Sequence, residues 1–459
     1  MSSGKSGGAF DPNRPFPPGS CRVHYGWIVA AAATVGIVCS IPGQTIGVGV
    51  FTDRLIEALG IRRTWISVAY LLGTIGSGFL IPSMGRWLDR RGIRLGAVVS
   101  AAGLGGGLVF LSQVDRIASG TGGFWPAGWF PLWQVACVTV GFFLIRFFGQ
   151  GLMTLASRNM IAKWFDGFRG RVTALSGVFA AFAFSLTPLL FDRLIAAEGW
   201  RAAWLWLAGA SGVGFGVFAW AVFRDNPEEC GLGLDAGMRA KPGRPANADN
   251  LVVRPFAREE ALRTYGFWIY NLSLSFQGFF ITGYTFHIVS VAGSLGIERE
   301  VALGAFFPAA VVAVLVSLGV GWLIDRTRLK YALLLFTVGV GLVPAALLAA
   351  PGPEAVGVLV AGLALSQGCF APVIGTVWAR FFGREHLGAI SGVNMSSLVV
   401  ASALGPIVFS LSYDWFGDYR PALWFGLVCA ILLFFGGLGA ENPQRRLAAG
   451  RETKGEGDA

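Results

Sequence analysis

Charged residues are scarce in this sequence. Asp, Glu, Lys and Arg make up only 14% of its 459 residues, while 54% are hydrophobic and 66 are glycine. A soluble chain of this length would need far more polar surface to cover its domains. The composition therefore excludes an ordinary soluble protein and predicts an all-α polytopic membrane protein.

Groups that serve metal binding and catalysis are equally sparse. The six cysteines show no C-x-x-C spacing and the chain has three histidines, which favours free packing cysteines over metal ligands or disulfides. No phosphate-binding loop and no nucleophile with a nearby base is apparent. We expect no enzymatic activity, no cofactor and no metal. The net charge of +10 is explained by basic residues at the ends of spans, so no nucleic-acid partner is expected.

Long apolar runs are abundant. At 1.5 Å per residue, about 20 residues cross the hydrocarbon core. Twelve such runs lie near 26–50, 65–84, 95–113, 134–157, 171–192, 202–223, 266–292, 301–324, 331–350, 355–379, 387–410 and 420–440. They predict an N-terminal tail 1–24, a six-helix bundle 25–223, a linker 224–264, a second six-helix bundle 265–440 and a C-terminal tail 441–459.

The basic residues predict the orientation. Taking alternate connections from the amino terminus, one set holds 27 of the 36 Lys and Arg and the other set holds eight. Positive charge is retained on the cytoplasmic side. We therefore expect the tails and the linker to be cytoplasmic, in a bacterial inner membrane with lipid around the helices.

The two halves of the chain repeat one another. Matched segments are Gly85 to Arg90 with Gly321 to Arg326, Tyr25-Gly26 with Tyr265-Gly266, Gln150-Gly151 with Gln367-Gly368, and Asn226-Pro227 with Asn442-Pro443. So many matches in one order indicate a duplicated unit. Six spans return the chain to its starting side, so the copies are parallel. The fold class is therefore twelve transmembrane helices in two pseudo-symmetric six-helix bundles.

One buried charge is not repeated. Arg146 lies at the middle of the span near 134–157, and at helical spacing Gln150 shares its polar stripe with Thr139, Thr154 and Ser157. An arginine at a helix centre costs roughly 2.5 to 3.5 kcal/mol on insertion scales, so it must face a partner or water. The shift of 217 residues that aligns its neighbours brings Arg146 onto Leu363. This asymmetry favours a functional arginine, an anion site or a proton relay, over a structural one bonded to carbonyls.

Other polar residues within the spans are candidates for the same cavity. The segment Ile41 to Thr45 interrupts the first span with a proline, and such interruptions are tolerated where they line a cavity. We select the side chains that do not readily satisfy their own helix, together with the repeat partner of that interruption: Gln44, Thr45, Tyr284, Asn271, Gln277 and Asn394. His287, near the end of its span, is interpreted as a hydrogen-bonded structural residue, with proton carriage as the alternative.

The segment from Gly85 to Arg94 resembles the G-x-x-x-D-R-x-G-R-[KR] loop of the major facilitator superfamily, and its degenerate copy lies at Gly321 to Lys330. The resemblance implies a gate at the cytoplasmic face. Its residues would be Gly85, Asp89, Arg90, Arg91, Gly92, Arg94, Asp325 and Arg326. Arg146 to Gly151 is similar to the R-x-x-Q-G motif of the fourth span, with one residue inserted.

Within the superfamily, Tyr25-Gly26-Trp27 and Gly199-Trp200-Arg201 are similar to monocarboxylate transporters and bacterial oxalate/formate-type exchangers. The resemblance implies a monomeric secondary transporter that moves a small organic anion by alternating access, coupled to protons or to a counter-anion. The alternatives are a transport-inactive sensor or scaffold on the same fold, and a transporter of a neutral or amphipathic small molecule.

Overall fold

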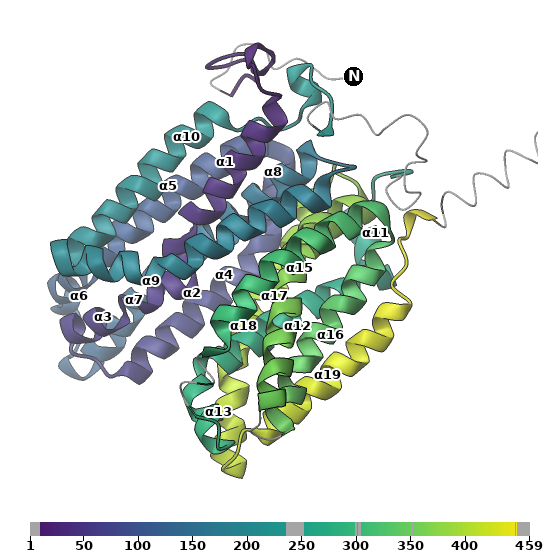
Figure 1. Cartoon of the computed structure of the whole chain (residues 1–459). Coiled ribbons are helices and arrows are strands. Elements are labelled where there is room, and N and C mark those ends of the chain that lie inside the picture. The colour runs from purple at the N-terminus through teal and green to yellow at the C-terminus, as the bar shows by residue number, and fades with distance from the viewer. Residues whose placement is uncertain are drawn as a thin grey trace, which may run out of the picture. The chain divides into compact units, whose positions relative to one another are not determined.

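The computed structural model describes residues 10–235, 252–298, 301, 304–349, 353–445 and 447. Parts of the predicted linker 224–264 and of the two predicted tails therefore lie outside the described residues. Within the described ranges the chain is built of helices and contains no strand (Figure 1). The prediction of an all-α membrane protein is confirmed.

In the part of the chain that the structure describes, ten helical stretches are long and apolar enough to cross a membrane. They consist of α1 to α2 (Tyr25–Cys39 and Thr45–Gly49), α4 (Arg63–Arg91), α5 (Ile93–Ser112), α7 to α8 (Phe130–Ile145 and Thr154–Trp164), α9 to α10 (Arg169–Leu207 and Phe215–Val222), α15 (Phe306–Arg326), α16 (Leu329–Leu348), α17 (Pro353–Phe382), α18 (Leu387–Phe416) and α19 (Arg420–Leu438).

These stretches are consistent with twelve spans. The stretch of α9 and α10 counts twice, because Gly199 breaks it with a non-helical backbone (φ 80°, ψ 158°). Helix α12 (Tyr265–Phe286) has 22 residues and supplies the remaining span. It is not among the ten apolar stretches because Asn271, Gln277 and two serines lower its mean hydropathy.

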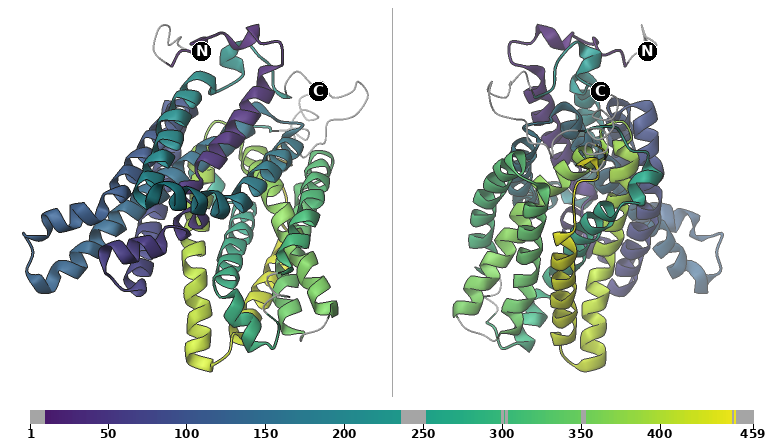
Figure 2. Two further views of the ribbon diagram at one scale, coloured as in Figure 1. Left: turned by 60° about the vertical axis from the view of Figure 1, so that its left-hand side comes forward. Right: turned by 90° about the vertical axis from the view of Figure 1, so that its right-hand side faces the viewer.

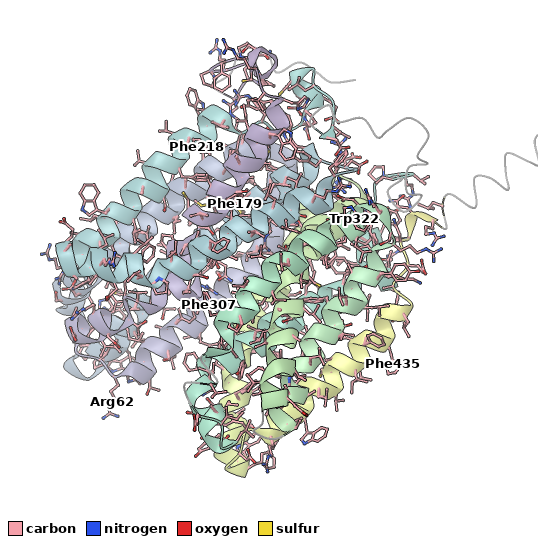
Figure 3. All side chains as sticks on the ribbon, in the orientation of Figure 1. Arg62, Phe179, Phe218, Phe307, Trp322 and Phe435 are labelled. Atoms are coloured by element: carbon pink, nitrogen blue, oxygen red, sulfur yellow. The ribbon has the colours of Figure 1, made fainter. Side chains whose placement is uncertain are left out.

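Short helices join the long ones, and apolar side chains cover much of the outside. The connecting helices are α3 (Thr52–Leu59), α6 (Val114–Gly122), α11 (Arg258–Leu262) and α13 (Ile288–Ser294). Large exposed apolar side chains include Phe179, Phe218, Phe307, Trp322 and Phe435 (Figure 3). Such a surface would be a liability in water and suits contact with lipid.

The chain divides into two compact units. Unit 1 comprises Met1–Trp164, Phe179–Gly237 and Ser391–Ser396, and unit 2 comprises Phe165–Val178, Met238–Ile390 and Ser397–Ala459. In unit 1, α4 packs on α7, and α5 packs on both α7 and α10. In unit 2, α17 packs on α15 and α16, and α16 packs on α19. Figure 2 shows the same helices from two further sides.

The first and last long helices of each repeat are joined by the same hydrogen bond. The Tyr25 hydroxyl, at the start of α1, donates to the Val222 carbonyl at the end of α10 (2.5 Å). The Tyr265 hydroxyl, at the start of α12, donates to the Gly436 carbonyl near the end of α19 (2.7 Å). The pairing of Tyr25 with Tyr265 found in the sequence therefore corresponds to a shared contact.

Unit 1 holds the segment before α1 with two buried arginines. Arg94 and Arg224 donate to four backbone carbonyls of that segment, those of Asp11 (2.9 Å), Pro12 (2.6 Å), Arg14 (2.7 Å) and Phe16 (3.2 Å). The backbone N–H of Arg94 also donates to Asp225 Oδ1 (2.8 Å). We call these contacts the first clip. They attach the described part of the predicted N-terminal tail to the helices.

Unit 2 holds the segment before α12 with an amide instead. Gln444, which is only 1% exposed, accepts through Oε1 from the N–H groups of Val253 (3.0 Å) and Arg254 (3.3 Å). Its Nε2 donates to the carbonyls of Arg254 (2.8 Å) and Phe381 (2.9 Å). We call these contacts, together with the neighbouring Glu441, the second clip.

Glu441 adds ion pairs to the second clip. It pairs with Lys330, with Arg445 (3.2 Å) and with Arg328 (3.6 Å). Partial burial would raise the pKa of its carboxyl, but these three cations together hold that pKa below its usual range.

Candidate functional site

The first spanning stretch is interrupted in its middle. α1 ends at Cys39, a 3-10 turn covers Ile41–Gly43, and α2 begins at Thr45. Gln44 between them is extended (φ −88°, ψ 160°). Because Pro42 lacks an N–H and Gln44 leaves the helix, backbone carbonyls here are released from the helical ladder. The Gly43 carbonyl thus becomes an acceptor for a neighbouring helix.

The second half of the site lies on a π-helix. The eight residues Arg146–Met153, between α7 and α8, form this wider helical turn. A π-helical turn takes up an extra residue within an α-helix and is frequent at functional sites. It accounts for the one residue inserted between Arg146 and Gln150.

The interruption and the π-helix meet at two glycines. A Cβ on Gly43 would lie 2.2 Å from the carbonyl oxygen of Ile145, and a Cβ on Gly149 would lie 3.0 Å from the Gly43 Cα. The two backbones are therefore in direct contact, and a side chain at Gly43 would force them apart. This close approach lets Arg146 reach the released Gly43 carbonyl.

Arg146 is almost completely buried, with 1% of its surface exposed. Its Nη1 donates to the Gly43 carbonyl (3.3 Å) and to Thr45 Oγ1 (3.3 Å). The guanidinium lies over the Tyr70 ring, with Cζ 5.1 Å from the ring centroid, an arrangement that stabilises a cation. The Tyr70 hydroxyl in turn donates to Thr45 Oγ1 (2.8 Å).

One edge of the Arg146 guanidinium has no partner. Its Nε is buried without an acceptor, and no described residue accepts a hydrogen bond from Nη2 or forms an ion pair with the group. Nε and Nη2 together form the side of the guanidinium that can bind a carboxylate through two parallel hydrogen bonds. The site therefore presents a fixed positive charge with a vacant bidentate edge.

Polar side chains continue from Arg146 along the same contact between helices. Gln44 Nε2 donates to Ser40 Oγ (3.1 Å) and to Thr154 Oγ1 (3.2 Å). Gln150 Oε1 and Ser157 Oγ are buried and have no hydrogen-bond partner. The structure thus brings together Arg146, Gln150, Gln44 and Thr45, the four predicted site residues of the first repeat, within unit 1.

Three of the four predicted site residues of the second repeat, Asn271, Gln277 and Tyr284, lie on one helix of unit 2. Asn271 donates to Ser397 Oγ (3.2 Å). Tyr284 stacks on Phe306, with ring centroids 6.3 Å apart, and its hydroxyl has no partner, nor does Gln277 Oε1. All three predicted residues are on α12, and no second cation is among them.

Two further polar residues of the second repeat differ in their surroundings. Asn394 is buried in α18, in the short part of that helix that belongs to unit 1. His287 Nε2 lies 3.0 Å from the Pro406 carbonyl and 3.2 Å from Ser410 Oγ. These contacts match the interpretation of His287 as a hydrogen-bonded structural residue.

Asp325, one of the predicted gate residues, caps the start of α9. Its carboxylate accepts from the backbone N–H groups of Gly170 (2.8 Å) and Arg171 (3.2 Å) and pairs with Arg171 Nε (3.3 Å). The helix N-terminus favours this negative charge. A Cβ on Gly321 would lie 2.6 Å from the Gly170 carbonyl oxygen, so the helices touch through their backbones. Arg326 covers the Trp322 ring at 4.0 Å.

The remaining gate residues lie where α4 meets α5. Gly85 and Asp89 are in the last turns of α4, followed by the exposed Arg90 and Arg91. Gly92, with φ of 95°, connects the two helices. Arg94 is also a predicted gate residue. Its buried guanidinium belongs instead to the first clip.

Sequence analysis missed Tyr70 and Ser40. Tyr70 is on α4, inside an apolar segment with no marker of function, and only the packing of α4 on α7 brings it to Arg146. Ser40 could have been found as a neighbour of the proline interruption. No spacing in the sequence points to Tyr70.

Comparisons with known proteins agree on the family. The sequence profile of the Major Facilitator Superfamily matches residues 31–367, which is well over half of the chain. No curated protein sequence matches.

Solved structures share the fold. One is a bacterial homologue of the iron transporter ferroportin in an outward-facing state with soaked iron (15% identity, 90% of this chain, 98% of that chain, TM-score 0.65). A second is a proton:xylose symporter (17% identity, 90% and 94%, TM-score 0.62). A third is a human organic anion transporter (15% identity, 90% and 99%, TM-score 0.60). At these identities the likeness shows the fold alone.

Proposed function

Because the chain belongs to the Major Facilitator Superfamily and shares the fold of its solved transporters, we propose that it carries a small, monocarboxylate-like organic anion across the membrane. The family and the fold make it an integral membrane transporter that works by alternating access. The substrate class is argued from the polar site of unit 1. Transport would be coupled to protons or to a counter-anion.

The vacant edge of Arg146 is the observation that carries the proposal. A buried cation is costly without a negative partner, and the described part of the chain supplies a carbonyl, a hydroxyl and an aromatic ring, but no carboxylate. A carboxylate that bound to Nε and Nη2 would supply the missing charge. Its own hydration would be replaced by charge-assisted hydrogen bonds in a site of low dielectric.

The number of cations favours a singly charged substrate. Arg146 is the sole cation in its hydrogen-bonded group, whose other members, Gly43, Thr45 and Tyr70, are neutral. The unpartnered Gln150 and Ser157 side chains could hydrogen-bond a hydroxyl or keto oxygen beside the carboxylate. A dicarboxylate would bring a second charge for which this group has no partner, so we expect monocarboxylates to be preferred.

The Asp325 contact supports a gating step in the same proposal. The carboxylate is tied to two backbone N–H groups at the start of α9 and to Arg171. Alternating access requires helix ends to separate on one side of the site and then on the other. In our proposal this contact breaks and re-forms once in each transport cycle.

Thermal unfolding of the purified protein with a series of short monocarboxylic acids tests the substrate class. A ligand that binds the folded state alone raises the unfolding midpoint by mass action. We expect the parent protein to be stabilised by at least one acid, Arg146→Lys to lose most of this stabilisation, and Arg146→Gln to lose all of it. Lys presents a single point charge and lacks the bidentate edge.

Arg116→Gln is the matched control, because Arg116 is an exposed arginine on α6 that donates a hydrogen bond to Gln113 just before that helix. It removes the same charge away from the site and should keep the full ligand response. Equal stabilisation of Arg146→Gln and the parent by the same acid would refute the role of Arg146. Counterflow of labelled acid into proteoliposomes then separates transport from binding. If acids bind without moving, the sensor alternative is supported, and if only neutral solutes move, the anion proposal is wrong.

A further inference from the structure

We infer that Tyr70 and Thr45 form a shutter over Arg146, and that the Tyr70 hydroxyl transfers its hydrogen bond from Thr45 to the bound carboxylate. This inference rests on the proposed function and adds a substrate-contacting residue to it. In the structure the shutter is closed, since the Tyr70 hydroxyl donates to Thr45 Oγ1 at 2.8 Å.

Exposure indicates which groups face outward at this point. Thr45 is exposed and Tyr70 is partly exposed, whereas Arg146 is 1% exposed. Tyr70 and Thr45 therefore form the surface of unit 1 here, and the guanidinium lies behind them. An anion that approaches Arg146 from this exposed side meets the contact between these two side chains first.

The hydrogen bonds of Thr45 show what breaking this contact would involve. Thr45 Oγ1 accepts from Tyr70 (2.8 Å) and from Arg146 Nη1 (3.3 Å), which occupies both lone pairs of a hydroxyl oxygen. A carboxylate oxygen is a better acceptor for the same donors, because the bonds to it are charge-assisted. Thr45 thus supplies the Tyr70 hydroxyl with a neutral acceptor in place of an anion.

The surroundings of Tyr70 allow this exchange without unfolding the site. Its ring meets the buried Phe142 edge-on, with centroids 5.6 Å apart and an interplanar angle of 77°, and it covers the guanidinium with its face. The hydroxyl is the part that reaches away to Thr45. Rotation about the Cζ–Oη bond of Tyr70 can therefore redirect the donated hydrogen while the ring keeps its contacts with Phe142 and Arg146.

Two substitutions break the same hydrogen bond from opposite ends. Tyr70→Phe keeps the ring and removes the donor that the carboxylate needs. Thr45→Val keeps the shape of the side chain and frees the Tyr70 hydroxyl for the ligand. Acid affinity should fall about tenfold or more in Tyr70→Phe, as expected for a lost hydrogen bond to a charged group. It should rise by about threefold in Thr45→Val, because no competing acceptor has to be displaced.

The affinities are to be measured by titration calorimetry with the acid that stabilises the parent most, on the full-length protein in detergent. Tyr265→Phe is the matched control, since it removes a tyrosine hydroxyl that donates to the Gly436 carbonyl, and its affinity should equal that of the parent. A fall in affinity in both Thr45→Val and Tyr70→Phe, or no change in either, would overturn the shutter. If the parent itself binds no acid, the proposed function fails instead, so the two failures are distinguishable.

Discussion

The two units share their clips and differ in their sites. In each repeat an acidic residue that precedes Asn-Pro meets a basic residue of the loop motif: Asp225 accepts from the Arg94 backbone, and Glu441 pairs with Lys330. Arg146, by contrast, corresponds to Leu363, a fully buried member of an apolar cluster in unit 2. Both copies of the duplicated unit retain the contacts that hold their six helices together. Only the first copy contains the buried charge.

The clips also show that one task can be performed by different chemistry. The segment before the first long helix of each repeat has backbone groups that need partners. Unit 1 satisfies carbonyls with the guanidinium groups of Arg94 and Arg224, while unit 2 satisfies both N–H and C=O groups with the Gln444 amide. An amide can accept and donate, whereas a guanidinium only donates. The two repeats therefore share the position of this contact but use different residue types to form it.

Deleting one residue from the π-helix should have the largest effect on binding. Removal of Phe148 restores the spacing of an ordinary α-helical motif and redirects Arg146 relative to Gly43. We expect a folded protein that loses acid binding, measured by thermal shift. The control deletes Val213 from the other π-helical segment, Ala208–Gly214, and should retain binding. Retained binding after removal of Phe148 would show that the π-helix does not position Arg146.

Placing an arginine at the position of unit 2 that corresponds to Arg146 should have the next largest effect, which is a loss of thermal stability. Leu363→Arg places a guanidinium in a packed apolar cluster, at a cost of roughly 3 kcal/mol or more. We expect a strongly lowered thermal midpoint and no new acid site, because the described helices α12 and α17, which match the interrupted helix and the π-helix of unit 1, are continuous α-helices. Leu363→Met, which roughly conserves volume, should cost less than about 1.5 kcal/mol. A stable arginine variant would mean that unit 2 can satisfy a cation as unit 1 does.

The clips allow a third test of the comparison. Gln444→Ala leaves several buried backbone groups without partners, at a cost of about 2 kcal/mol. Arg224→Ala should cost a similar amount by releasing the carbonyls of Pro12 and Phe16. Proteolysis of the purified variants should show faster cleavage near residues 10–18 in the arginine variant and near 252–256 in the glutamine variant. Cleavage at neither site would contradict the clip assignment.

Replacing the two matched tyrosines, Tyr25 and Tyr265, should change thermal stability least. Tyr25 is 1% exposed and Tyr265 is 56% exposed, although both hydroxyls donate to a carbonyl. Tyr25→Phe leaves a buried acceptor unpaired and should cost about 1 kcal/mol, whereas water or lipid headgroups can replace the bond lost in Tyr265→Phe, at roughly zero cost. Equal losses of thermal stability would show that burial does not separate the two contacts.

Much of the architecture could be read from residues alone. Apolar runs of sufficient length gave the spans, because backbone groups in lipid must be satisfied within each helix. The repeated Tyr25 and Tyr265 pointed to contacts that the structure contains. The polar stripe of Arg146 and the interruption at Pro42 were visible because polar and helix-breaking residues are rare in such runs. Agreement with twelve predicted spans required the structure to be read with the sequence, since α12 is polar and α9 continues into the next span.

The site itself depended on tertiary structure. That Arg146 is buried and exceptional was determined by the sequence, because a guanidinium in an apolar run is recognisable without any coordinates. Which of its edges is occupied was decided by the approach of Gly43 to Gly149 and by Tyr70, which lies 76 residues away from Arg146 along the chain. Hydrophobic periodicity records which face of a helix is polar. It does not record which neighbouring helix supplies the partners, because these are fixed only when backbones come into contact.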